Sequence, residues 1–190
     1  MFKNLFALVG FLTIIAVGVI FVGAKSIFSE FDSGAGKTYT ELVQNILDTK
    51  DAASATVWRF PVAEGLSAEE VEETMKFVAN EHNIANVGEL PLSQDITAKM
   101  GKPYRFVKIF LFCNSLTAAQ MLDYNDAFSA YLPCRITLVE DTTGKLWIYS
   151  LNMDLMIHGG KPLPPELKAE AEKVKEIILD IMKRGAEGDF

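Results

Sequence analysis

The chain has 190 residues, of which 49% are hydrophobic, and it carries a formal net charge of −7. About 165 residues follow an apolar N-terminal run, which is enough for one domain with its own core. The acidic excess argues against a nucleic-acid partner, because phosphate binding needs a concentrated face of Lys and Arg. It also argues against docking of the folded domain on an anionic lipid surface.

Residues 1–25 are predicted to be a transmembrane anchor. Residues 5–24 contain no charged side chain and a single hydroxyl, at Thr13. Twenty residues at 1.5 Å per residue cross a hydrocarbon core of ~30 Å as a helix. Residues 22–24 (VGA) also satisfy the small-residue rule for signal-peptide cleavage, which leaves a cleaved signal as the alternative.

The orientation of the anchor follows from its flanks. Lys3 and the α-amino group precede the span and Lys25 follows it, so the basic residues nearly balance. The amine and the short N-terminal flank favour a cytoplasmic N-terminus. We therefore expect a single-pass protein of the inner (cytoplasmic) membrane whose domain faces the periplasm.

Residues 26–53 are predicted to be a linker that contains a short amphipathic helix. The sequence SGAGKT at residues 33–38 invites comparison with a phosphate-binding loop, but the required earlier glycine is Phe31 and no strand precedes it. We interpret it as a flexible linker in which Thr38 or Thr40 caps the following helix. The apolar face of that helix would carry Leu42, Val43, Ile46 and Leu47.

The rest of the chain, residues 54–185, alternates between strand and helix patterns, and residues 186–190 form a tail. Strands are expected over residues 55–63, 84–92, 105–113, 132–140 and 146–150. Helices are expected over residues 67–83, 93–100, 115–123, 152–157 and 166–184. This order predicts an α+β domain with a mainly antiparallel sheet and helices packed on one face.

The strand over residues 105–113 has the clearest pattern. Lys108 is the only polar residue inside it, so most of both faces should be covered, as in a central strand or a subunit interface. Ser115 is expected to cap the next helix. The residues of that helix predicted to lie against the sheet are Leu116, Ala119, Gln120 and Leu122.

Cys113 ends one predicted strand and Cys134 begins the next, which leaves three interpretations open. The cysteines could form a structural disulfide if the strands are neighbours. They could be buried, inert thiols. They could also carry redox, sulfur-carrier or metal chemistry, which needs a thiol of lowered pKa. Cys113 lies two residues before a helix start and Arg135 adjoins Cys134, and both features favour such a shift.

A weaker candidate for a metal site follows the last predicted strand. Met153, Met156 and His158 combine thioether and imidazole groups, which suit copper(I). Met at helical spacing is more often part of a core, and His at a helix end is more often a cap. The sequence has two histidines, neither in a nucleophile motif, so we expect no catalytic residues and no cofactor.

Residues 112–114 (FCN), 131–136 (YLPCRI) and 139–141 (VED) together resemble the signature of domain-of-unknown-function family 302. Residues 152–156 and the final amphipathic helix add to the likeness, which covers residues 54–183. Ser115 stands where the family usually has Pro. The resemblance implies a compact α+β domain with a TATA-binding-protein-like arrangement, without DNA binding, and a tendency to dimerise. It implies no settled activity.

The sequence therefore favours a membrane-anchored, non-catalytic domain that binds or scaffolds a partner, as a homodimer or as a subunit of a membrane complex. Apolar surface for the partner would come from Phe110 and Phe112 and from the aromatic cluster Tyr124, Phe128 and Tyr131. The binding candidates are Cys113, Asn114, Cys134, Arg135, Phe110 and Phe112. The rival hypothesis is thiol redox or sulfur-carrier chemistry at the two cysteines, and a third is a small hydrophobic ligand held between sheet and helices.

Overall fold

A computed structural model describes residues 6, 10–19, 22–23 and 29–190 of the chain. Residues 10–19 are helical. No helix in this described part of the chain is both long and apolar enough to cross a membrane. The predicted span also includes residues 5, 7–9, 20–21 and 24, which lie outside the described residues. The membrane anchor therefore stays a prediction.

The domain is built on one antiparallel sheet in the order β1-β5-β4-β3-β2. All five expected strands are present, so the predicted α+β class is confirmed. β3 lies inside the sheet, between β4 and β2. The strands are β1 (Val57–Pro61), β2 (Ala85–Leu90), β3 (Val107–Cys113), β4 (Cys134–Glu140) and β5 (Leu146–Leu151).

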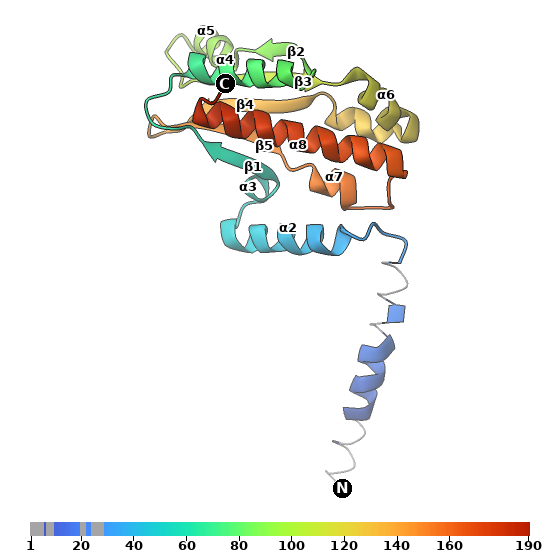
Figure 1. The fold of residues 1–190 in the computed structure, drawn as a ribbon. Coiled ribbons are helices and arrows are strands. Elements are labelled where there is room, and N and C mark those ends of the chain that lie inside the picture. Colours follow the sequence, from blue (N-terminus) through green and yellow to red (C-terminus); the bar gives the residue numbers. More distant parts are fainter. Residues whose placement is uncertain (1–5, 7–9, 20–21, 24–28) are drawn as a thin grey trace.

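The helices fall into two groups, seen in Figure 1. The long helices α4 (Ala68–Glu81) and α8 (Pro165–Glu187) lie side by side across one face of the sheet. Shorter helices lie around the ends of the sheet or lead into it. They are α2 (Ala35–Thr49), α3 (Ala52–Ala55), α5 (Leu92–Met100), α6 (Ser115–Tyr124), the 3-10 helix η1 (Asp126–Tyr131) and α7 (Asp154–His158).

The core lies between the sheet and the two long helices. Alternation along β3, β4 and β5 directs every second side chain toward the helices. These inward side chains are fully buried: Phe110, Phe112, Ile136, Leu138 and Ile148. The helices meet them with Val71, Met75, Val78, Ile178, Ile181 and Met182. The opposite face of β3 is only partly covered, because Ile109 and Leu111 are half-buried.

Local sequence explains where α4 and α8 begin and end. Ser67 and Glu70 form a capping box at the start of α4, as the serine and the acidic first turn predict. Pro165 occupies the first turn of α8, where a missing N–H costs nothing. The helix ends at Gly188, whose φ of 70° suits glycine.

The segment before α2 is docked on the domain, which corrects the prediction of a flexible linker. Asp32 is buried, and its carboxylate accepts hydrogen bonds from the Lys168 ammonium and from the Gly34 backbone N–H. Its other close neighbour is His158 Nδ1, at 3.1 Å from Oδ1. The Asp32 backbone N–H donates to the Gly160 carbonyl at 2.8 Å. The hydrogen bond from Lys168 holds the pKa of Asp32 down, at about 2.

α2 begins at Ala35, which is earlier than a cap at Thr38 or Thr40 would allow. Its N-cap residue is Gly34, so no side-chain hydrogen bond caps the helix. A Cβ at Gly34 would lie 3.0 Å from the His158 ring, so close packing on α7 explains glycine here. The helix is amphipathic as predicted, yet Val43, Ile46 and Leu47 are exposed.

Replacing Gly185 by alanine should weaken the contact between α8 and α4. An added Cβ would lie 2.5 Å from Cγ of the buried Met75 and 3.4 Å from Ile148 Cδ1. Overpacking of this kind lowers the free energy of unfolding by about 1–3 kcal/mol. Urea unfolding measures the change. The control is Gly36→Ala in α2, where nothing lies within 4 Å, and an unchanged midpoint for Gly185→Ala would contradict the tight packing.

Replacing Asp32 by asparagine should undock the segment before α2. We expect amide exchange of residues 32–38 to rise as the opening free energy falls by about 1–3 kcal/mol, the usual cost when a charged partner is lost. A carboxylate with a lowered pKa stabilises above its ordinary value of 3.8 and ceases to do so as the pH falls towards about 2. Wild-type protection should therefore decline over that range, whereas the variant should show no such step. Asp95→Asn, which removes an exposed pair with Lys99, is the control.

Candidate functional site: a sulfur-lined pocket

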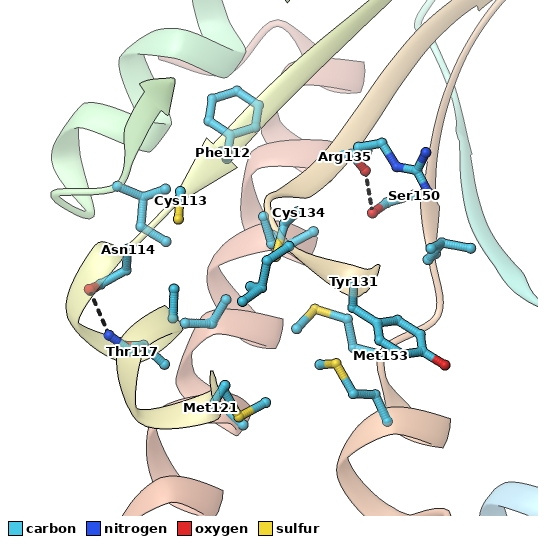
Figure 2. A pocket seen from close by; sticks show the side chains of 18 of the residues that line it. Phe112, Cys113, Asn114, Thr117, Met121, Tyr131, Cys134, Arg135, Ser150 and Met153 are labelled. Carbon is cyan, nitrogen blue, oxygen red and sulfur yellow. Dashed lines mark hydrogen bonds between the residues drawn. The ribbon is translucent and has the colours of Figure 1, made fainter. Parts of the chain in front are cut away.

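The candidate site is a pocket where the sheet and helix layers meet beyond the ends of β3 and β4. Side chains from α6, η1, α7 and α8 complete it. The pocket has a water-accessible volume of about 60 Å³. This is several times the volume that one water molecule needs. Figure 2 shows Cys113, Cys134, Met121 and Met153 around the hollow.

Asn114 positions the helix that forms one wall of the pocket. Its side-chain oxygen accepts hydrogen bonds from the N–H groups of Leu116 and Thr117. Asn114 is therefore the N-cap of α6, and Ser115, which was expected in that role, is the first helical residue. The binding candidate Asn114 thus lines the site while its oxygen is committed to the cap.

The face of α6 that turns inward also differs from the prediction. Thr117 and Met121 are buried and line the pocket, whereas Leu116 is 79% exposed. A helix capped at Asn114 and followed by η1 presents residues 117 and 121, one turn apart, to the core. The prediction that Leu116, Ala119, Gln120 and Leu122 face the sheet was therefore wrong, because the buried face carries Thr117 and Met121 instead.

The two cysteines reach the pocket from neighbouring strands. Cys134 is the cross-strand partner of Phe112, so Cys113 lies one position beyond that pair, at the end of β3. Both are free thiols. Cys113 is one position past the Phe112–Cys134 pair, so the two cysteines are diagonal to each other, and they are not bonded. Both side chains nevertheless line the pocket, because β3 ends at Cys113.

The environment of Cys134 does not activate its thiol. Burial raises the pKa of Cys134 to about 11, and the nearby Cys113 adds to the rise. Arg135 is exposed, and its backbone carbonyl accepts a hydrogen bond from Ser150 Oγ at 2.8 Å. The expectation that Arg135 would lower this pKa is therefore wrong.

The weak metal candidates are divided between two places. Met153 and Met156 line the pocket. His158 instead lies between Asp32 and Glu172, with Nε2 at 3.4 Å from the glutamate oxygen. Among the described residues, no three His, Cys, Asp or Glu side chains are grouped to hold a metal ion. The Met–Met–His ligand set is therefore not assembled.

Phe110 and Phe112 stack at 6.4 Å between ring centroids and are fully buried. Neither offers surface to a partner, although Phe112 forms part of the pocket wall. The aromatic cluster at the end of α6 and on η1 is different. Tyr124 and Tyr131 are 42% and 50% exposed, and Phe128 lies between them with centroids at 6.1 and 6.5 Å. Tyr131 also lines the pocket, so this cluster borders it.

Two features of the site were missed in the sequence. Met121 was not singled out, and η1 was not expected, although Asn125 caps it through its side-chain oxygen. The available signal was Asn125, eleven positions after Asn114, which marks the end of α6 and the start of η1.

Comparison with known proteins agrees with this architecture. A family model described as "Domain of unknown function DUF302" matches residues 58–185. No curated protein matches the chain. Among solved structures, the chain is similar to an uncharacterized conserved protein DUF302 from Bacillus stearothermophilus, with a TM-score of 0.55 and 17% identity over 68% of this chain and 97% of that one. The likeness in structure supports the fold alone, and the family match, which spans more than half of the chain, shows that this protein belongs to the DUF302 family.

Proposed function

We propose that the domain is a non-catalytic binding module that holds a small apolar ligand in the sulfur-lined pocket. The observation that carries the proposal is a partly open hollow whose wall is predominantly apolar. The wall has no carboxylate among its described residues, and Arg135 is its one cationic side chain. Such a site selects by shape and apolar contact rather than by charge.

The polar groups in the wall support binding rather than catalysis. The Asn114 oxygen is engaged as a helix cap, and the Ser150 hydroxyl donates to a backbone carbonyl. Acyl or proton-transfer chemistry would need a free, activated group. The raised pKa of Cys134 likewise counts against a redox or sulfur-carrier role that depends on a reactive thiolate.

Filling the pocket should abolish ligand binding. Ala118 lines the pocket, and Ala119, its neighbour on α6, is exposed. Benzene serves as the probe, with labelled methionine methyl groups observed by NMR. In the wild type, the methyl signals of Met121, Met153 and Met156 should shift while that of the exposed Met100 does not. Ala118→Phe should weaken benzene binding by at least about tenfold, or ~1.4 kcal/mol.

Ala119→Phe is the matched control and should bind benzene as the wild type does. Shifts spread over all methionines, or full binding by Ala118→Phe, would contradict the proposal. Native mass spectrometry of the protein purified from membranes would then identify any ligand that accompanies it.

We further propose that the domain is held at the periplasmic face of a membrane. The support is the uncharged run of residues 5–24 and the exposed apolar side of α2, which begins after residues 25–34. The ten residues 25–34, which are docked on the domain from Asp32 onward, keep the start of α2 within about 35 Å of the predicted span. Val43, Ile46 and Leu47 can therefore lie in the interface of the same bilayer, where an amphipathic helix buries its apolar side.

The exposed aromatic cluster formed by Tyr124, Phe128 and Tyr131 favours a protein partner as a second role. Tyr is more frequent in protein–protein interfaces than on the rest of the protein surface. A second copy of the chain or another subunit of a membrane complex would cover this surface. A ligand in the adjoining pocket would then contact the same interface.

The membrane proposal predicts that the full chain, expressed in bacteria, stays in the membrane fraction after alkaline washing. Protease added to spheroplasts should degrade the domain. Ile14→Lys with Ile15→Lys should release the protein, because each central charge raises the cost of insertion by about 3 kcal/mol. Retention of this double variant, or protection of the wild type from protease, would contradict the proposal. A shortened intact mass would favour the cleaved-signal alternative.

A further inference from the structure

The pocket brings together five sulfur-bearing side chains from separate parts of the sequence. Cys113 and Cys134 come from β3 and β4, and Met121 comes from α6. Met153 precedes α7 and Met156 lies within it. The side-chain oxygens of Asn114, Ser150 and Asn152 already take part in hydrogen bonds. Thr117 and Tyr131 contribute hydroxyl groups, so the five sulfur atoms are the most numerous potential ligand atoms in the wall.

This donor set selects among metal ions. Magnesium and calcium prefer carboxylate and carbonyl oxygens, and no Asp or Glu occurs among the described lining residues. Structural zinc sites use four Cys or His ligands, whereas this pocket offers two thiols and no histidine. Thiolate together with thioether is the combination that favours copper(I).

We propose that the pocket binds a single Cu(I) ion through the sulfurs of Cys113 and Cys134, with a thioether from Met153 or Met156 as a further ligand. The inference rests on the pocket described above as the binding site, and it goes beyond the apolar ligand by assigning the same pocket a second kind of occupant, a soft metal ion. Cys134 lies opposite Phe112, the residue before Cys113, so the two cysteines are diagonal neighbours across two hydrogen-bonded strands. That arrangement brings both thiols to one end of the sheet.

Binding exchanges protons for metal without electron transfer. Each thiol loses a proton to solvent as its copper–sulfur bond forms, and copper remains Cu(I) throughout. Two thiolates and one Cu(I) leave a net charge of −1, and Arg135 is the cationic residue among the described lining residues. The titratable lining groups are Cys113, Cys134 and Tyr131, with Arg135 as the fixed charge. Because thiols must deprotonate, affinity should rise with pH.

Anaerobic competition between the full-length protein in detergent and bicinchoninate tests the proposal. The wild type should remove one equivalent of Cu(I) from the chelator, and X-ray absorption should show sulfur neighbours alone. Cys113→Ser and Cys134→Ser should each weaken Cu(I) binding by at least about tenfold, as loss of a direct ligand exceeds the usual effect of an outer-shell change. Met153→Leu should weaken it less. Met100→Leu, on exposed α5 outside the pocket, should leave it unchanged.

Benzene binding separates the possible failures. A cysteine variant that still shifts the pocket methionine signals with benzene retains a folded pocket, so its loss of Cu(I) is a loss of ligands. Wild-type protein that binds benzene but not Cu(I) would overturn this inference and leave the proposed function standing. Cu(I) binding that survives the double cysteine variant, or nitrogen and oxygen neighbours in the absorption spectrum, would also overturn it. Cu(I) binding without benzene binding would support the metal site and refute the apolar ligand.

Discussion

The contact between α8 and one face of the sheet is the constraint on which the structure depends. The side chains of Ile178, Ile181 and Met182 are almost completely removed from water against β4 and β5. At about 25 cal/mol per Å² of apolar surface, burial of such side chains contributes roughly 2 kcal/mol each. The pocket lies where this close packing ends, with Ala171 and Val174 of α8 in its wall. Its shape is therefore set by the same helix that holds the domain together.

A hollow lined by sulfur and hydrocarbon has a definite chemical character. Water gains few hydrogen bonds inside it, so expelling water costs little. The position of Tyr131 joins this interior to the exposed surface around η1. A partner bound to the aromatic cluster would contact Tyr131, which also lines the pocket. A ligand in the pocket would therefore change the surface that the partner contacts.

Much of the fold could be predicted because its strands carry strong local patterns. Alternation identified β3 and β4, and with them the positions of Cys113 and Cys134 at strand ends. What failed depended on contacts distant in sequence. Asn114 and Ser115 are both plausible caps, and the choice moved the inward face of α6 by one residue. The burial of Asp32 depends on Lys168, 136 residues away, so no local pattern could reveal that the linker is docked. The sulfur pocket itself arises where β3, β4, α6, η1, α7 and α8 meet, which happens only after folding.

The docking of Asp32 has a mechanical meaning if the N-terminus is fixed in a membrane. A pull on the chain from that side would act first on the Asp32–Lys168 pair and on the hydrogen bond from Asp32 N–H to Gly160, not on the sheet. These contacts would break under a lower force than the sheet, so α2 would separate from the domain before β1 is strained. Release would lengthen the tether and free the domain to rotate, and protonation of a single carboxylate would lower the force required.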